Sequence, residues 1–309
     1  MDPRSEMYKN RYKNFILVTT VPVFAFYVAF MIVPIGMSLF YSLFDWAGFT
    51  ADMDFVGLSN YSSLLFKDEI FRTTIINSLK YVIYGGVLIF AITLLFTYRI
   101  SNFKSKRLKD FIQMLLFVPN TISPVALGIG WTFLLNPRWG AVNNIIDALG
   151  LGAIKRPWLS EEFIFASMMS LLVWIHVGFF LVMFLAAADR IPPSLYESAQ
   201  LDGASTWKMF TTITVPLVRD IISTSVVMWI IFSFKIFGYI FAFIGGAASD
   251  PPVNIRNIAV QLYLTGFGKR TPLYRLGYAS GMGIILLLLV VLLTYIAQRL
   301  FRTTETLEF

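Results

Sequence analysis

Two residues with titratable side chains are conspicuous because apolar residues surround them. His176 is the only histidine, and Lys235 lies within a long hydrophobic run. An imidazole in such surroundings could relay a proton, or it could simply form a hydrogen bond to a neighbouring helix, and both interpretations stay open. A lysine there is costly unless it faces a cavity or a carboxylate, so Lys235 is a candidate functional residue.

The motifs that usually carry enzyme chemistry are absent from the sequence. It contains no HExxH pattern, no GxSxG nucleophile elbow and no pair of candidate catalytic carboxylates. Cysteine is also absent, which excludes disulfides, thiolate metal sites and cysteine nucleophiles. Gly266-Phe267-Gly268-Lys269 lacks the first glycine and the spacing of a Walker A loop. We therefore expect no catalytic residue, metal site or cofactor in this chain.

The composition indicates that lipid is the main solvent of the chain. Of its 309 residues, 57% are hydrophobic and 14% are charged. With about 20 residues needed to cross a bilayer, the apolar runs predict roughly six spans. The runs cover residues 15–43, 75–98, 111–135, 163–188, 217–244 and 276–297. Their alternation is too poor for a membrane barrel, so we predict an all-α integral membrane protein with a single transmembrane domain over residues 1–309.

The net charge of +7 is better explained by membrane topology than by nucleic-acid binding, because the basic residues cluster beside apolar runs. Loops on one predicted side hold more Lys and Arg, including the densest cluster, Arg99 to Lys109. Because cytoplasmic loops carry the excess of positive charge, both termini are predicted to be cytoplasmic. The first apolar run is too long for a signal-peptide core, and we expect it to remain as the first span.

Two prolines should interrupt the third span. Pro119 and Pro124 lie close to Asn120, Thr121 and Ser123, and each proline removes a backbone donor. The freed carbonyls could line a cavity, or a neighbouring helix could satisfy a simple kink. Both interpretations stay open.

The loop over residues 191–216, between spans four and five, has the pattern of a small folded element. Pro192 and Pro193 resist continuation of span four, and Ser194 with Glu197 fits a capping box that begins a new helix. That helix should reach about Asp202, with Gly203 in the left-handed position that follows a helix end. A second amphipathic turn should then lead to Pro216 and span five. We predict a helix, turn and helix near the membrane surface.

Within this loop the sequence resembles a known family, the permease subunits of ABC importers. The family signature is Glu-Ala-Ala, three residues, Gly, nine residues, then Ile-x-Leu-Pro. Here the chain has Glu197-Ser198-Ala199, Gly203 and Ile213-Thr214-Val215-Pro216 at the same spacing.

Other segments resemble the carbohydrate-uptake branch of this family, which includes the maltose and glycerol-3-phosphate types. Phe55-Val56-Gly57-Leu58-Ser59-Asn60-Tyr61 is similar to the branch's Phe-Val-Gly-Leu-x-Asn-Tyr element, and Asn77-Ser78-Leu79 is similar to the start of its second span. Departures occur at Gly238, often Asp in the branch, and at Gly245-Gly246-Ala247, usually Gly-Gly-Pro.

The resemblance implies a type I importer permease in a bacterial or archaeal inner membrane. Its partners would be a second homologous permease, a dimer of ATPase subunits that bind ATP and Mg, and an extracytoplasmic substrate-binding protein that delivers a sugar. Asp202-Gly203-Ala204 is also similar to the branch's usual form around the motif glycine. The coupling residues that the resemblance implies are Glu197, Ser198, Ala199, Asp202, Gly203 and Ala204. Glu197 could contact the ATPase or could only complete the capping box.

A sugar pocket should combine aromatic platforms for CH faces with a few polar groups for hydroxyls. Spans four and five offer both kinds of side chain, at positions similar to those that line the sugar cavity in relatives. The candidate cavity residues are His176, Phe179, Trp229, Phe232, Ser233, Lys235 and Ile236.

Two other classes of function fit the sequence less well. A secondary carrier or channel could also have six spans, but it would ordinarily need coupling-ion residues, and no intramembrane acidic pair is evident. Such a protein would also leave the loop over residues 191–216 without a role. An intramembrane enzyme lacks its motifs here.

Overall fold

The computed structural model describes residues 3–103, 105–243, 250–268 and 274–301, and almost all of its elements are helices. Among these residues, five helical segments are long and apolar enough to cross a membrane, and a bent pair of helices gives a sixth. The spans are Phe15–Tyr41, Glu69–Ser101, Ile164–Ala188, Arg219–Ala242 and Leu276–Phe301, with the bent pair Lys106–Thr121 and Pro124–Leu134. The predicted all-α class is confirmed. Residues 245–247 of the family pattern lie outside the described residues.

Short π and 3₁₀ turns, labelled η, connect many of the helices. In chain order the elements are α1 (Pro3–Tyr27), η1 (Val28–Ile32), α2 (Val33–Tyr41), β1 (Phe44–Trp46), β2 (Met53–Phe55), α3 (Ser59–Ser62), η2 (Ser63–Lys67), α4 (Glu69–Lys80), η3 (Tyr81–Gly85), α5 (Gly86–Ser101), α6 (Lys106–Phe117), η4 (Val118–Thr121), α7 (Pro124–Leu134), α8 (Ala141–Ala148), η5 (Gly152–Ile154), α9 (Ile164–Ala188), α10 (Pro193–Leu201), α11 (Thr206–Met209), η6 (Phe210–Thr214), α12 (Val215–Leu217), α13 (Arg219–Phe234), α14 (Phe237–Ala242), η7 (Val253–Ile255), α15 (Ile258–Gly266) and α16 (Leu276–Phe301).

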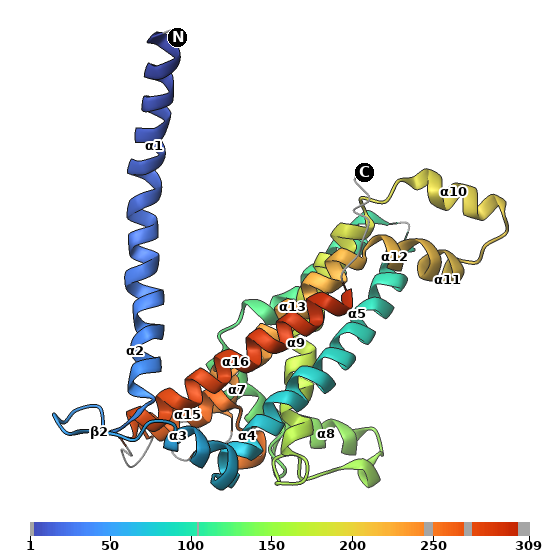
Figure 1. Cartoon of the computed structure of the whole chain (residues 1–309). Coiled ribbons are helices and arrows are strands. Elements are labelled where there is room, and N and C mark those ends of the chain that lie inside the picture. The colour runs from blue at the N-terminus through green and yellow to red at the C-terminus, as the bar shows by residue number, and fades with distance from the viewer. Residues whose placement is uncertain (1–2, 104, 244–249, 269–273, 302–309) are drawn as a thin grey trace.

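The first span stands apart from the other helices. Figure 1 shows α1, η1 and α2 as one blue rod that meets the body only at its lower end, where α2 packs against α16. Apolar side chains along the rod, such as Phe15, Phe24 and Phe30, are 63–76% exposed. Within this chain, most of the rod's apolar surface therefore has no protein to pack against.

Helix α9 lies at the centre of the remaining helices. It contacts α5, α6 and α13, and Leu172, Ile175 and Phe180 on it are completely buried. A buried helix is expected to be apolar on all sides, and α9 is apolar along nearly its whole length. Its central position makes α9 the support for the side chains that approach it from both broken spans.

The predicted interruption of the third span is confirmed as a sharp bend. The first half, α6 followed by η4, ends at Thr121, α7 begins at Pro124, and the two halves are bent by 100°. The freed carbonyl of Val118 accepts a hydrogen bond from Thr121 Oγ1 at 2.7 Å, so the break satisfies part of its own polarity.

The fifth span contains a second break, which the predicted continuous run over 217–244 did not include. Helix α13 ends at Phe234, and α14 begins at Phe237. No proline causes this break. The Asn257 side-chain amide donates to the Phe234 carbonyl at 3.2 Å, while its oxygen accepts from Val260 N at 3.0 Å and caps α15. The buried Asn257 thus stabilises the helix end in α13 and the helix start in α15.

The elements divide between two ends of the molecule. In Figure 1 the start of α1, the end of α16 and helix α10 lie at the upper end, while β2, α4 and α8 lie at the lower end. At the lower end β1 and β2 form an antiparallel pair with Phe44 opposite Phe55. The two ends therefore carry different structures: a helical loop at one end, and a small hairpin with helix α8 at the other.

Candidate functional site

A cavity of about 260 Å³ lies where the two broken spans meet α9. The break of the third span contributes one wall, α9 the second, and the break between α13 and α14 the third. The lining residues are Asn120, Pro124, His176, Phe179, Phe232, Lys235, Ile236 and Tyr239. Aromatic rings and neutral polar groups thus surround the space together with a single lysine.

Most of the cavity residues predicted from the sequence lie together. His176, Phe179, Phe232, Lys235 and Ile236 line the cavity, whereas Trp229 and Ser233 do not. The sequence expectation had not included Asn120, Pro124 or Tyr239. The prolines that break the third span were the available signal for the first two, because broken helices expose polar backbone to a cavity.

Trp229 is a packing residue behind the cavity. It is 1% exposed, and its indole Nε1 donates to the Val82 carbonyl at 2.9 Å. Its ring covers Gly85 so closely that a Cβ there would overlap it. The ring centroid of Trp229 also lies 5.1 Å from that of His176, so the tryptophan supports a lining residue from behind.

Ser233 is also excluded from the cavity by helix packing. It is completely buried, and its hydroxyl donates to the Ile230 carbonyl at 2.8 Å. Its spacing from Trp229 and Ile236 had suggested that Ser233 faces the cavity. In the structure Phe232 lines the cavity, whereas Ser233, one residue further around the helix, lies in the core.

His176 is held by its own helix. Its Nδ1 lies 2.8 Å from the carbonyl oxygen of Leu172, and the residue is 5% exposed. Because a carbonyl can only accept, Nδ1 carries the proton in this hydrogen bond, which leaves Nε2 of the neutral ring as an acceptor. The ring also contacts Phe232 and Tyr239, with centroids 6.0 and 6.4 Å away. The hydrogen bond that the sequence interpretation assigned to a neighbouring helix is therefore formed within α9 itself.

Lys235 differs from the other lining residues in charge and exposure. It follows the last residue of α13, and its side chain is exposed. Among the described residues, three ion pairs are formed, and none involves Lys235. The lysine also borders an apolar groove formed with Ile35 of α2 and Leu287 of α16.

The loop over residues 191–216 forms the predicted helix, turn and helix. Helix α10 ends at Leu201, and Gly203 has a φ of +76°. The amides of Gly203 and Ala204 donate to the carbonyls of Gln200 and Ala199 at 3.0 and 2.9 Å, which closes the helix end. The expected glycine C-terminus is confirmed.

The predicted capping box at Ser194 is wrong. Helix α10 begins one residue earlier, at Pro193, and has no side-chain cap. Proline at the first helical position has a suitable fixed φ and needs no donor, so the helix starts there without a serine cap. Glu197 is consequently exposed and has no hydrogen-bonding role at the helix start.

Side-chain hydroxyls and rings attach this loop to the helical body. Tyr196 Oη lies 2.9 Å from Thr214 Oγ1, which ties α10 to η6. Tyr98 Oη in α5 lies 3.0 Å from Thr206 Oγ1, and the Tyr98 ring meets that of Trp207 with a centroid distance of 5.0 Å. The base of the loop is therefore fixed, while α10 extends away from the bundle in Figure 1.

Helix α10 presents an outer surface without a partner in this chain. Leu195 is 39% exposed and Leu201 is 90% exposed, and Ser198 and Asp202 are also exposed. Glu197 is exposed too, but it lines the space between α10 and the helical bundle. A polar space of about 560 Å³ separates α10 from the ends of α5 and α9. Small, acidic and apolar side chains together make α10 suitable for contact with another protein.

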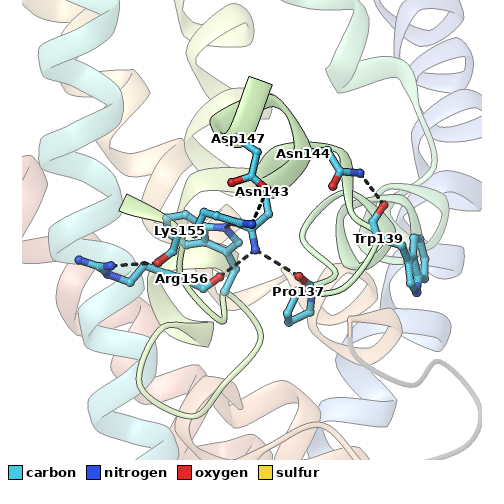
Figure 2. Close-up of polar contacts among 8 residues, drawn as sticks. Pro137, Trp139, Asn143, Asn144, Asp147, Lys155 and Arg156 are labelled. Carbon is cyan, nitrogen blue, oxygen red and sulfur yellow. Dashed lines mark hydrogen bonds and ion pairs between the residues drawn. The ribbon is translucent and has the colours of Figure 1, made fainter. Parts of the chain in front are cut away.

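The opposite end of the molecule is covered by the α8 cap, residues 136–163. Figure 2 shows Asn143 at its centre, where the side-chain amide donates to the Pro137 and Arg156 carbonyls at 3.5 and 3.2 Å. Trp158 Nε1 donates to Asn143 Oδ1 at 2.8 Å. An ion pair between Lys155 and Asp147 lies beside this network. One buried asparagine thus connects three segments of the cap.

The chain matches the model of a protein family, binding-protein-dependent transport system inner membrane component, over residues 88–305. It is similar to the probable ABC transporter permease protein YurN of Bacillus subtilis, with 28% identity over 92% of this chain and 94% of that protein. It is also similar to the diacetylchitobiose uptake system permease protein NgcF of Streptomyces coelicolor, with 28% identity over 92% of this chain and 80% of the relative.

Solved structures share the fold. A chain of a bacterial ABC transporter involved in the import of the acidic polysaccharide alginate superposes with a TM-score of 0.76 and 24% identity, covering 96% of this chain and all of that chain. A chain of the bacterial alginate ABC transporter in complex with a pentasaccharide-bound periplasmic protein gives a TM-score of 0.79, also at 24% identity, and covers 96% of both chains.

Proposed function

Because the chain belongs to the family of binding-protein-dependent transport system inner membrane components, we propose that it is a transmembrane subunit of an ATP-driven sugar or oligosaccharide importer. Relatives named for uptake of diacetylchitobiose and arabinooligosaccharides support a sugar as the solute. The observation that carries the proposal is the cavity between two broken spans, because it brings rings and polar groups together inside a membrane protein.

The cavity has the chemistry that a sugar ring needs. Phe179, Phe232 and Tyr239 offer faces and edges for CH groups, while Asn120 and the free Nε2 of His176 can bond to hydroxyls. Its volume of about 260 Å³ is below the range of roughly 300–1,000 Å³ usual for small-molecule sites. This chain would therefore contact part of the solute, and a second, homologous permease would supply the rest of the site.

Helix α13 offers a mechanical connection between the loop and the cavity. It begins at Arg219, soon after the loop, and ends at Phe234, beside Phe232 and Lys235 of the cavity. Its 16 residues span about 24 Å at 1.5 Å per residue. In the proposed mechanism, movement of α10 by a closing ATPase dimer would shift α13 as a rigid element and open or close the cavity.

In this account α10 is the coupling helix. Its exposed residues Glu197, Ser198 and Asp202, with Ala199, Gly203 and Ala204 at its end, would lie in a cleft of an ATPase subunit. ATP and Mg would be bound and ATP hydrolysed by that partner, since this chain has no Walker A pattern. Glu197 makes no capping bond in α10 and borders the open space beside that helix, which supports contact with a partner that enters this space.

The same account assigns an orientation to both ends of the chain. If α10 is cytoplasmic, the start of α1 and the end of α16 are cytoplasmic too, since they lie at that end of the molecule (Figure 1). The α8 cap would then face the extracytoplasmic substrate-binding protein. The exposed first span would pack against lipid and the second permease.

Affinity purification tests the assembly. The tagged chain would be expressed with its chromosomal neighbours, extracted in mild detergent and analysed by mass spectrometry. We expect an ATPase and a second permease to remain bound. A stable chain that is repeatedly recovered alone would contradict the proposal and favour a secondary carrier.

A further inference from the structure

Lys235 gives the cavity a charge that the neutral sugar chemistry above does not use. Every other lining side chain is apolar, aromatic or neutral and polar, including Asn120, His176 and Tyr239. The ammonium group therefore sets the sign of the electrostatic potential in the cavity.

The apolar runs predicted from the sequence hold no carboxylate near Lys235 along the chain. In the six predicted apolar runs, the only acidic residue is Asp220. Asp220 lies in the first turn of α13, whereas Lys235 caps its far end. At about 1.5 Å per residue, the length of α13 separates the two by roughly 20 Å. Its own helix thus keeps the nearest intramembrane acid far from the lysine.

The helix break places Lys235 at the border of the cavity. At the end of α13, Lys235 N donates to the Phe232 carbonyl at 2.8 Å, and Asn257 occupies the Phe234 carbonyl. Asn257 is buried, whereas Lys235 is exposed and lines the cavity with Phe232 and Ile236. A cation within a span is costly unless a cavity or an anion accommodates it.

We propose that Lys235 binds an anionic group of the transported solute, so that the substrate is an acidic sugar or oligosaccharide bearing a carboxylate, sulfate or phosphate. This inference rests on the proposed function and narrows its substrate class. The ammonium would form a charge-assisted hydrogen bond to the anion, while Phe179, Phe232 and Tyr239 would contact the apolar faces of the ring. A carboxylate of the second permease is the competing partner for the same charge.

The test measures uptake by the complete transporter in proteoliposomes. It compares uronic-acid oligosaccharides with the same molecules after their carboxylates have been reduced to alcohols, at binding-protein concentrations that saturate for each. The wild type is compared with Lys235→Gln and Lys235→Arg. Lys80→Gln is the matched control, because Lys80 Nζ lies over the Phe165 ring, 5.7 Å from its centroid, and does not line the cavity.

We expect Lys235→Gln to lower uptake of the acidic sugars by roughly tenfold or more, since hydrogen bonds to charged groups are among the stronger ones. Uptake of the reduced sugars should fall less, because they lack the anionic group, so the ratio of acidic to neutral uptake should drop. Lys235→Arg should keep most acidic uptake, and Lys80→Gln should leave the ratio of acidic to neutral uptake unchanged.

Three results would overturn the inference. An equal loss of acidic and neutral uptake in Lys235→Gln would indicate that the lysine pairs with a protein carboxylate. Unchanged uptake of the acidic sugars in Lys235→Gln would show that the lysine does not recognise the substrate. If the wild type took up only the neutral sugars, the acidic substrate would be contradicted, but the proposed function as a sugar importer would stand. Failure to transport any sugar would overturn the proposed function as well.

Discussion

Gly178 of α9 lies directly against the main-chain carbonyl of Leu116 in α6, so that a Cβ at position 178 would overlap the carbonyl oxygen. This close approach occurs two residues after His176 and one before Phe179, both of which line the cavity. The backbone contact places the broken third span against α9, and it therefore determines the position of one cavity wall.

Gly178→Ala should destabilise the protein by about 1–3 kcal/mol, because an added methyl group has no space and forces α6 away from α9. The midpoint of thermal unfolding in detergent measures the effect. Gly130→Ala in α7 is the matched control, since a Cβ there meets nothing within 4 Å. Equal midpoints for the two variants would contradict the close contact.

Two glycines have nearly the same backbone conformation, so a comparison of their alanine variants distinguishes an effect on coupling from an effect on stability. Gly203 after α10 has a φ of +76°, Gly150 after α8 has a φ of +72°, and neither has an atom within 4 Å of a built Cβ. Alanine at either site should cost roughly 1–2 kcal/mol through backbone strain alone. We expect similar unfolding midpoints, but reduced ATPase stimulation by the loaded binding protein only in Gly203→Ala. Equal stimulation in both variants would argue against a coupling role for the end of α10.

Glu197→Lys should uncouple transport from ATP hydrolysis while leaving membrane insertion intact, because it reverses a charge on the exposed surface of α10. Uptake and ATPase activity measured in the same proteoliposomes would show this. Asp110→Lys reverses an exposed charge on α6, outside both α10 and the α8 cap, and serves as the control. Full transport with normal ATPase stimulation in Glu197→Lys would remove this residue from the interface.

Asn143→Leu should loosen the α8 cap. The change leaves the Trp158 indole, the Pro137 carbonyl and the Arg156 carbonyl without their partner, at about 1–3 kcal/mol for each group that stays buried. Limited proteolysis should cut residues 136–163 faster. Asn144→Leu removes one exposed bond, to the Trp139 carbonyl, and should change the cleavage rate little. Equal cleavage of both variants would contradict the central role of Asn143.

The sequence allowed the apolar spans and the break of the third span to be predicted, because both are local signals. Apolar runs of membrane length and prolines act within one segment. The break of the fifth span depends instead on Asn257, which bonds to Phe234 from 23 positions away. The sequence around Phe234 contains no pattern that predicts this contact.

The cavity was predicted in part for the same reason. Spacing along α13 placed Trp229 and Ser233 near Phe232, but it could not show which side chains the core would cover. The burial of Trp229 depends on η3, where the Val82 carbonyl accepts the hydrogen bond from the indole and Gly85 packs against the ring. The capping prediction at Ser194 was wrong because both proline and serine favour a helix start, and α10 begins at Pro193, before the serine.

The central claim is tested most directly by sugar uptake into proteoliposomes that contain this chain, the second permease and the ATPase subunits, with substrate-binding protein outside. The account predicts uptake that requires both internal ATP and the binding protein, and that is lost in Glu197→Lys. Uptake by this chain alone, driven by an ion gradient and independent of ATP, would contradict it.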